Sequence, residues 1–415
     1  MKLYFPVKTL NLTANLPASK SLSNRALILQ ALAESAVEIR NLSDADDVKM
    51  LQNALHSGVA EINIGNSGTA MRFLTAFFAQ TAGEKILTGS ARMKQRPVGI
   101  LVDALKTLGA KIAYLENEGF PPLKIIGKPL SGGEVALDGG VSSQFASALM
   151  MIAPKMKNGL KIRLQRAVVS QPYIEMTAKI MRHFGVFVHF DGKFIEIPPQ
   201  KFVPQPLEIE NDWTAASYWY EMLAVAGDGE VFLPNLTKNS WQGDKIVAEI
   251  FEKYFNIKTE YLPNGISIKT TKNEQRKKIV NCQLLMSNYP DLAQTLAVTC
   301  LLRTVPFRFT GLETLKIKET DRLAALTAEA RKIGFVLKTE NENTLAWNGE
   351  TCAKPDKIVI STHNDHRMAM AFAPVALHFP VEIENPETAA KSYPNFWEEI
   401  LAPGRKIIYT VIGNN

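Results

Sequence analysis

The sequence predicts an α/β protein made of two similar halves, each assembled from βαβ-type units. The chain has 415 residues, a length that favours two domains over one. Five segments share one pattern, in which an amphipathic helix is closed by Gly or Asn and followed by an alternating strand. The helices are expected at residues 47–58, 98–109, 174–185, 244–256 and 321–334. Such a recurring helix–strand pattern is typical of α/β folds.

The end of each predicted helix supports this interpretation. The closing residues are Gly58, Gly109, Gly185, Asn256 and Gly334. Gly and Asn readily adopt the left-handed backbone conformation that ends many helices. Between residues 204 and 213 a Pro-rich strand gives way to Asp-Trp-Thr-Ala-Ala-Ser, and we expect a domain boundary there.

The composition favours a globular enzyme over a nucleic-acid-binding protein. Hydrophobic residues make up 46% of the chain, enough for an ample core. The net charge is +6, but Lys and Arg are spread along the sequence and form no basic stripe. This modest positive excess suits a site for a small, multiply charged anion.

The sequence also predicts a cytoplasmic protein without a membrane anchor. Cys282, Cys300 and Cys352 lie far apart with no CxxC pair, which argues for a reducing compartment. The first residues lack the features of a signal or transit peptide. No apolar run reaches the length needed to span a bilayer.

The segment Ile64-Gly-Asn-Ser-Gly-Thr-Ala-Met-Arg72 carries the strongest local signal. It lies between an apolar strand pattern at 59–64 and an apolar helix pattern at 70–78, so it predicts a tight turn at a helix start. A helix start presents unpaired N–H groups and a partial positive charge, which bind anions. Gly68 lets the backbone approach such a ligand closely. No Gly-Lys-Ser/Thr follows, so this is not a Walker loop.

Polar and cationic side chains recur at other predicted helix starts in the first half. Such a start can be an ordinary polar cap, but here hydroxyl, amide and cationic groups occur together. They include Lys20, Ser21 and Arg25 before an apolar helix, Arg96 before Pro97, Ser142 to Gln144 before an Ala/Leu/Met-rich helix, and Ser170 with Tyr173.

The second half repeats this arrangement and adds carboxylates. The relevant residues are Asp291 after Pro290, Lys318, Glu319 and Arg322 in KETDR, His363, His366 and Arg367 in THNDHRMAM, and Lys391 in KSYP. The two histidines have no third ligand at a suitable spacing, so no metal is expected.

These segments predict one strongly positive cleft between the two halves. If the helix starts converge, their N–H groups and cations surround a common space, which suits two small anionic substrates. Asp291 and Glu319 are the few carboxylates among the cations, so they are the natural candidates for proton transfer.

An ordered set of motifs resembles the enolpyruvyl transferase family, and within it the 5-enolpyruvylshikimate-3-phosphate synthases. The motifs span nearly the whole chain: SKSLSNRAL, GNSGTAMR, RPVG, SSQF, SQPYIE, PD, KETDRL, NDHRMAM and KSYP. The resemblance implies two domains, each of three βαβαββ units around a pseudo-threefold axis, an inside-out α/β barrel. The implied ranges are 1–14 with 212–415, completed by the N-terminal strand, and an inserted domain at 15–211.

The resemblance also implies the reaction. The 5-hydroxyl of shikimate 3-phosphate adds to C2 of phosphoenolpyruvate, and the tetrahedral intermediate then loses phosphate. C–O cleavage replaces phosphoryl transfer, so neither a metal nor another cofactor is expected. The implied partners are these two small molecules, with no nucleic acid or membrane, and the implied state is a monomer.

By position in the matching motifs, the resemblance implies which residues bind each substrate. Shikimate 3-phosphate is expected to contact Lys20, Ser21, Arg25, Ser142, Ser143, Gln144, Ser170, Tyr173, Asp291 and Lys318. Phosphoenolpyruvate is expected to contact Lys20, Gly68, Arg96, Gln144, Arg322, Arg367 and Lys391. Glu319 is expected to protonate C3 and Asp291 to accept the hydroxyl proton, with Lys20 able to share either role.

The chain departs from the usual family pattern at a few positions. Ser67 replaces a common Ala, Phe73 replaces a common Pro, and Thr314 stands where several members have Asn, so no binding role is carried over to Thr314. The family inhibitor glyphosate is still expected to fit beside Gly68, because Gly has no side chain.

Three other functions compete with this interpretation. The sister transferase acting on UDP-N-acetylglucosamine usually has a Cys in the loop at 89–96, and this chain has none there. A non-catalytic anion-binding protein would not need the full set of cations and carboxylates. RNA-end chemistry on a related fold would need an adduct-forming His and a basic RNA-binding face, and neither is evident.

Overall fold

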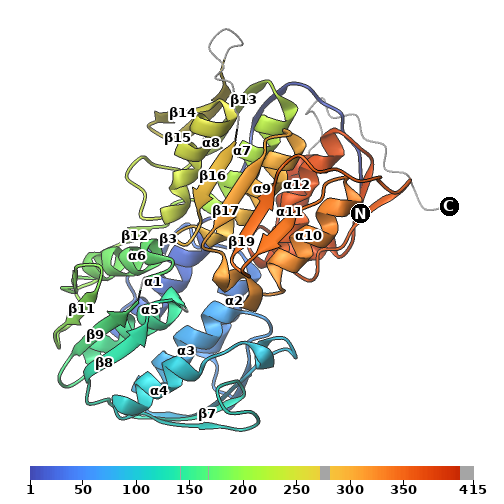
Figure 1. Cartoon of the computed structure of the whole chain (residues 1–415). Coiled ribbons are helices and arrows are strands. Elements are labelled where there is room, and N and C mark those ends of the chain that lie inside the picture. The colour runs from blue at the N-terminus through green and yellow to red at the C-terminus, as the bar shows by residue number, and fades with distance from the viewer. Residues whose placement is uncertain (141, 167, 272–280, 402–415) are drawn as a thin grey trace. The chain divides into compact units, whose positions relative to one another are not determined.

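A computed structural model describes residues 1–140, 142–166, 168–271 and 281–401 (Figure 1). The last residues of the predicted second domain, 402–415, lie outside the described residues. The chain forms two compact units. The inserted unit comprises Ala18–Ile209, and the terminal unit comprises Met1–Pro17 with the chain from Glu210 onward.

The inserted unit contains six α-helices among its described residues, and their starts matter for the site. Three begin at the predicted motifs: α1 (Lys20–Ala33), α3 (Gly68–Gln80) and α5 (Ser143–Ile152). The others are α2 (Asp46–His56), α4 (Gly99–Thr107) and α6 (Gln171–His183), with 3₁₀ turns η1 (Met93–Gln95) and η2 (Ala153–Lys155).

The described strands of the inserted unit form three sheets. One has the order β4 (Glu61–Asn63), β5 (Gly83–Thr88), β7 (Leu123–Gly127) and β6 (Lys111–Tyr114). The second has the order β10 (His189–Phe190), β11 (Phe194–Ile197), β9 (Leu160–Gln165) and β8 (Gly133–Asp138). The third pairs β12 (Leu207–Glu208) with β3 (Ile39–Arg40).

The terminal unit repeats this design. Its described helices are α7 (Trp213–Ala226), α8 (Val247–Phe255), α9 (Ala293–Leu302), α10 (Arg322–Lys332), α11 (His366–Ala371) and α12 (Phe396–Leu401). Its 3₁₀ turns are η3 (Gly243–Ile246), η5 (Pro290–Leu292), η6 (Glu313–Ile317), η7 (Ala373–Leu377) and η8 (Pro386–Lys391).

The described strands of the terminal unit also form three sheets. The first has the order β14 (Ile257–Leu262), β15 (Gly265–Thr270), β13 (Gly229–Pro234) and β2 (Leu10–Thr13). The second has the order β16 (Cys282–Leu285), β17 (Phe307–Thr310), β19 (Thr344–Trp347) and β18 (Lys338–Glu340). The third has the order β1 (Lys2–Leu3), β21 (Val381–Ile383) and β20 (Ile358–Ile360).

The four four-stranded sheets share one topology. In each, the first two strands along the chain pair in parallel, and the second strand pairs antiparallel with the last. Along the chain, the four strands and two helices of each repeat occur in the order βαβαββ, as in β4-α3-β5-α4-β6-β7. The N-terminal β2 completes its sheet by pairing in parallel with β13, and the paired residues lie 219 positions apart, as in Leu10–Gly229 and Thr13–Phe232.

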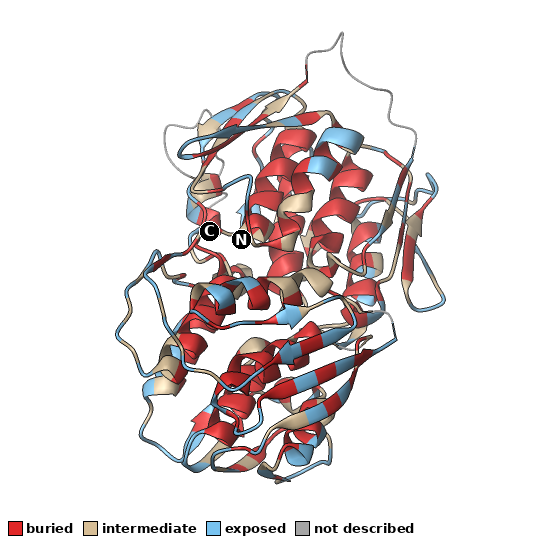
Figure 2. Ribbon diagram, turned by 90° about the vertical axis from the view of Figure 1, so that its left-hand side faces the viewer, coloured by how far each residue is buried: buried red, intermediate tan, exposed pale blue. Residues whose placement is uncertain are grey.

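Burial distinguishes two kinds of helix. All ten residues of α9 and twelve of the thirteen in α3 are buried, so these helices occupy the interior of their units. Many strands bury alternate residues, as β9 does, and thus turn one face inward (Figure 2). The recurring sequence pattern corresponds to the outer helices α2, α4, α6, α8 and α10.

Candidate active site

Arg25, on the inner helix α1, is the centre of a buried polar network in the inserted unit. Its Nε donates to Thr177 Oγ1 at 2.7 Å, and its Nη2 donates to Ser147 Oγ at 3.2 Å. Its remaining bonds go to the backbone oxygens of Ser21, at 2.9 Å, and Tyr173, at 3.4 Å. The network thereby joins α1, α5 and α6.

All of these partners are neutral, so Arg25 brings positive charge into the interior. Among the described residues, no carboxylate lies within ion-pair distance of Arg25, which is only 2% exposed. Burial lowers the pKa of its guanidinium to about 10. The Arg25 guanidinium also stacks on the ring of Phe73 at 5.3 Å, so the residue that departs from the family pattern contacts the cation. This environment favours an anionic ligand.

Lys20 is the first residue of α1, whose N-cap is Ser19. The Lys20 Nζ lies 3.5 Å from Asp47 Oδ2, and its side chain is 14% exposed. Lys20 and the half-buried Ser21 thus lie at a helix start with a positive dipole end, as the sequence predicted.

Gly68 begins α3, and two guanidiniums crowd its backbone. A Cβ at this position would lie 2.6 Å from both Arg72 Nη1 and Arg96 Nη2, so only glycine fits without displacement. Arg72 Nη1 donates to the Gly68 oxygen at 2.9 Å, and Arg96 Nη1 donates to the Asn66 oxygen at 3.4 Å. Ser67, another departure from the family pattern, caps α3 by accepting from Ala70 N at 3.3 Å.

The starts of α5 and α6 supply the other predicted polar groups. Ser142 caps α5 by accepting from Gln144 N at 3.3 Å, and Ser143 is buried. Gln144 Nε2 donates to Thr69 Oγ1 at 3.2 Å, which connects the starts of α5 and α3. Ser170 precedes α6 with a left-handed backbone, φ 56°. Such a conformation is uncommon for Ser, and functional sites often contain it.

Arg322 organises the charged groups of the terminal unit. It is buried at the start of α10, where its Nε donates to Asp365 Oδ2 at 2.7 Å. Its Nη1 and Nη2 donate to Asp291 Oδ1 at 3.1 Å and Glu319 Oε2 at 3.0 Å. Burial opposes its charge, but the Asp365, Glu319 and Asp291 carboxylates raise the pKa of Arg322 above its ordinary value.

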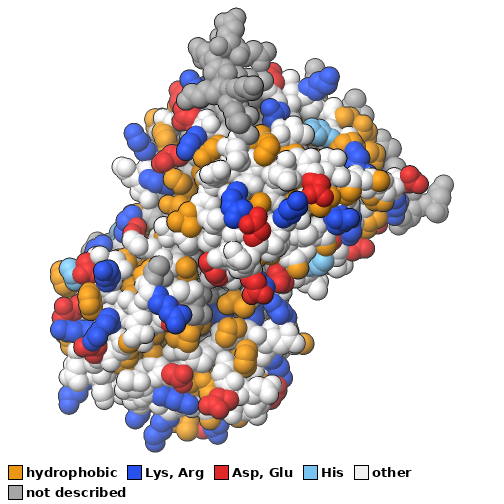
Figure 3. Space-filling view, in the orientation of Figure 1, with side chains coloured by type: hydrophobic (Ala, Val, Ile, Leu, Met, Phe, Trp, Pro, Cys, Tyr) orange, Lys and Arg blue, Asp and Glu red, His pale blue; other side chains and the backbone are white. Residues whose placement is uncertain are grey.

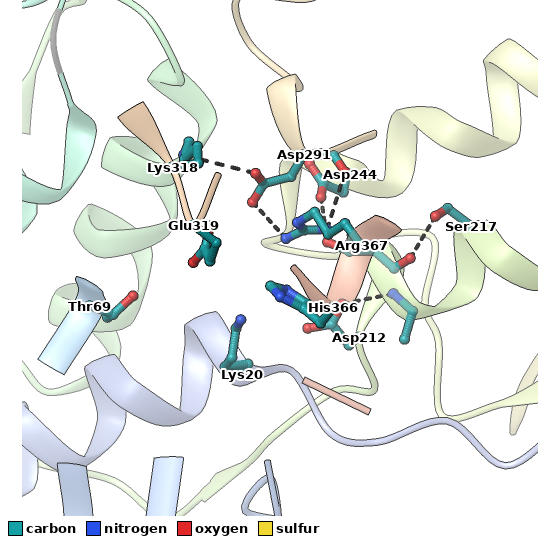
Figure 4. Close-up of polar contacts among 12 residues, drawn as sticks. Lys20, Thr69, Asp212, Ser217, Asp244, Asp291, Lys318, Glu319, His366 and Arg367 are labelled. Atoms are coloured by element: carbon teal, nitrogen blue, oxygen red, sulfur yellow. Dashed lines mark hydrogen bonds and ion pairs between the residues drawn. The ribbon is translucent and has the colours of Figure 1, made fainter. Parts of the chain in front are cut away.

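Asp291 contacts three cations of the terminal unit, of which Figure 4 labels Lys318 and Arg367. Its Oδ2 accepts from Arg367 Nη2 at 2.7 Å, its Oδ1 accepts from Arg322, and Lys318 Nζ lies 3.9 Å from that oxygen. Arg367 Nη1 also donates to the Asp291 backbone oxygen at 3.1 Å. Asp291 lies in η5, directly before the inner helix α9.

Glu319 shares Arg322 with Asp291 and contacts Lys391. Lys391 Nζ donates to Glu319 Oε1 at 2.6 Å, and both side chains are largely buried. The structure therefore brings Asp291, Lys318, Glu319, Arg322, Arg367 and Lys391 into one connected cluster. A cluster of four cations and the two predicted carboxylates can bind an anion and move a proton.

Several residues of these networks had no assigned role in the sequence analysis. They are Thr69, Arg72, Ser147, Thr177, Asp244 and Asp365. Thr69, Arg72 and Asp365 stand inside the recognised motifs, so the motifs themselves could have indicated them. Ser147 and Thr177 lie within α5 and α6, and neither stands in a recognised motif that could have indicated it.

The two histidines of the THNDHR segment, residues 362–367, face different partners. His363 Nε2 lies 2.9 Å from Glu329 Oε1, whereas His366 Nδ1 lies 3.6 Å from Asp365 Oδ1. Among the described residues, no three His, Cys, Asp or Glu side chains are grouped closely enough to hold a metal ion.

Comparison with known proteins identifies related sequences. A family model described as EPSP synthase (3-phosphoshikimate 1-carboxyvinyltransferase) matches residues 6–62 and 51–400. A Bacteroides fragilis protein named 3-phosphoshikimate 1-carboxyvinyltransferase is 47% identical over 394 residues, covering 94% of this chain and 95% of that protein. A Haemophilus influenzae protein of the same name is 38% identical over 427 residues, covering 95% and 96%.

Solved structures show the same fold. The EPSP synthase from Acinetobacter baumannii aligns with a TM-score of 0.76 over 99% of this chain and 100% of that chain, at 19% identity. The predicted two-domain α/β fold is thereby confirmed.

Proposed function

The chain belongs to the EPSP synthase (3-phosphoshikimate 1-carboxyvinyltransferase) family, and from that premise we propose how its residues carry out the reaction. The reaction transfers the enolpyruvyl group of phosphoenolpyruvate to the 5-hydroxyl of shikimate 3-phosphate and releases phosphate, a step of the shikimate pathway to aromatic amino acids. The observation that best supports this proposal is the buried charge of Arg25, whose hydrogen-bond partners in the structure are all neutral oxygens.

We propose that the inserted unit binds the phosphate and ring of shikimate 3-phosphate. Arg25 supplies a permanent charge, and the starts of α1 and α5 supply N–H groups and hydroxyls. Asp291 and Lys318 of the terminal unit meet the ring hydroxyls. The full set is Lys20, Ser21, Arg25, Ser142, Ser143, Gln144, Ser170, Tyr173, Asp291 and Lys318.

Phosphoenolpyruvate is assigned to the cations around Gly68 and around Arg322. Guanidinium groups match a carboxylate or phosphate in a bidentate manner, and three arginines are available for the two anionic groups. The set is Lys20, Gly68, Arg96, Gln144, Arg322, Arg367 and Lys391. Because both units contribute, the active site is proposed to lie between them. Glyphosate, the family inhibitor, is proposed to bind beside Gly68.

The carboxylates are assigned the proton transfers. Asp291 accepts the proton of the 5-hydroxyl as its oxygen attacks C2, and Glu319 donates a proton to C3. Phosphate then leaves the tetrahedral ketal as the C3 proton is returned. The contacts of Glu319 with Arg322 and Lys391 hold both of its carboxylate oxygens in place. Lys20 is a second candidate for either transfer.

The chemistry requires charge neutralisation and no cofactor. The bond that breaks is C–O, so no phosphoryl group is transferred that a metal ion would need to stabilise. Fixed cations neutralise the carboxylate and two phosphates of the substrates instead.

We propose a cytoplasmic monomer without nucleic-acid or membrane partners. Across the described ranges, no helix is both long and apolar enough to cross a bilayer. On the face shown in Figure 3, Lys and Arg are interspersed with Asp and Glu instead of forming a basic surface. Exposed ion pairs such as Arg308–Glu340 likewise place opposite charges side by side on the surface.

The test is phosphate release from phosphoenolpyruvate by the purified protein in the presence of EDTA. Shikimate 3-phosphate and UDP-N-acetylglucosamine serve as alternative acceptors. Turnover with shikimate 3-phosphate alone is expected. Turnover only with UDP-N-acetylglucosamine would identify the sister activity, and no turnover by a folded sample would favour an anion-binding protein.

A further inference from the structure

Asp244 is a buried carboxyl beside the charged cluster of the terminal unit. It lies in η3 and is 3% exposed. The hydroxyl of Thr214, at the start of α7, donates a hydrogen bond to Asp244 Oδ2. Figure 4 shows the Asp244 carboxyl next to Asp291 and to the side chain of Arg367. Asp244 therefore faces two groups that have proposed roles in the reaction.

The backbone around Asp244 is held in place. Gln242 Oε1 accepts from Trp213 N at 3.1 Å, and Gln242 Nε2 donates to the Asn211 oxygen at 2.7 Å and to Glu210 Oε2 at 2.9 Å. These bonds tie the segment before η3 to the start of α7, which also carries Thr214. Asp244 consequently cannot move away from its neighbours without breaking buried hydrogen bonds.

The charges around Asp244 come from three elements. Asp291 of η5 and Asp212 before α7 are negative, while Arg367 of α11 is positive. Burial raises the pKa of the Asp244 carboxyl to about 7, and Asp291 acts in the same direction. The Thr214 hydrogen bond and Arg367 oppose the increase.

We propose that Asp244 is a positioning residue whose charge adjusts the affinity of Arg367 for phosphoenolpyruvate. This inference rests on the proposed role of Arg367. When Asp244 is neutral, the positive charge of Arg367 is offset mainly by the carboxylate of Asp291. An ionised Asp244 adds a second negative charge and weakens that field for an incoming anion.

The sign of the pH dependence follows from this arrangement. Below pH 7 the carboxyl is protonated and binding of phosphoenolpyruvate is tightest. As pH rises through 7 the carboxyl ionises and the affinity falls. Binding of the anion favours the protonated form, so the complex takes up a proton from solution near neutral pH.

The experiment measures KM for phosphoenolpyruvate from pH 6 to pH 8.5 with saturating shikimate 3-phosphate. Between pH 6.5 and 8.5 the wild-type KM is expected to rise about fivefold more than that of Asp244→Asn, since Asn resembles the protonated acid. The phosphate of the substrate titrates equally in both proteins and cancels in the comparison. Asp103→Asn, an exposed change on α4, should keep the wild-type profile.

Two further measurements keep the test decisive. Thr214→Val removes a hydrogen bond that favours the ionised carboxyl, so it should move the midpoint of the profile to higher pH. Titration calorimetry in buffers of different ionisation enthalpy should show proton uptake in the wild type that Asp244→Asn lacks. The inference would be overturned if the wild type, Asp244→Asn and Thr214→Val all showed the same KM profile and the same proton uptake. No turnover by the wild type would instead overturn the proposed function.

Discussion

Replacing Arg25 by Met separates ligand binding from structural stability. Burial lowers the pKa of Arg25 from its ordinary value to about 10, which corresponds to about 3 kcal/mol of unfavourable charge burial. Below pH 10 the guanidinium is charged in both the folded and the unfolded chain, so this cost is constant between pH 5 and 9. Met removes the cost but also four hydrogen bonds to neutral oxygens, each contributing about 1 kcal/mol.

The two effects nearly cancel, so the free energy of unfolding should change by less than about 2 kcal/mol. Binding of shikimate 3-phosphate should weaken at least about 100-fold, because a charge-assisted contact to phosphate is lost. Denaturant unfolding at pH 7, with and without shikimate 3-phosphate, measures both quantities. The ligand should stabilise the wild type by mass action but not the variant.

Arg163→Met is the matched control, because Arg163 is exposed and pairs with Glu134 on the surface. It should change neither stability nor binding appreciably. A large loss of stability in Arg25→Met combined with unchanged affinity for shikimate 3-phosphate would refute the reasoning, since Arg25 would then be a structural residue.

Other substitutions test the remaining parts of the site. Gly68→Ala places a Cβ 2.6 Å from two guanidiniums, so KM for phosphoenolpyruvate should rise about tenfold in steady-state kinetics, while KM for shikimate 3-phosphate changes little. Glu319→Gln should lower kcat by about 100-fold or more with modest effects on KM, and near-normal turnover would exclude Glu319 as the acid. Ser67→Ala removes the cap of α3 and should cost about 1 kcal/mol in denaturant unfolding, with activity retained when folded.

The helix starts could be predicted from sequence because their signals are local. Ser19, Ser67 and Ser142 accept backbone hydrogen bonds at the starts of α1, α3 and α5, the positions that the polar motifs indicated. The outer helices could also be predicted from sequence, because one face of each helix is buried and the other is exposed. The left-handed φ of 59° at Asn256 closes α8 as its residue type suggested.

The inner helices and the ion-pair partners were harder to predict from sequence. A helix such as α9, buried on every side, has no periodic polar face to reveal it. The Arg322–Asp365 pair joins residues 43 positions apart. Asp244 and Asp291 are also far apart in the sequence, and only the fold brings them close enough to interact electrostatically. Recognition of the motif set supplied the roles of the site residues, whereas spacing and composition indicated only an anion site with candidate carboxylates.

The most direct test of the account is a crystal structure of the protein with shikimate 3-phosphate and an unreactive phosphonate analogue of phosphoenolpyruvate. We expect one adjacent pair of ligands, contacted by Arg25 and the start of α5 from the inserted unit and by Asp291, Arg322 and Arg367 from the terminal unit. Ligands bound by residues of one unit only, or at two separate places, would contradict it.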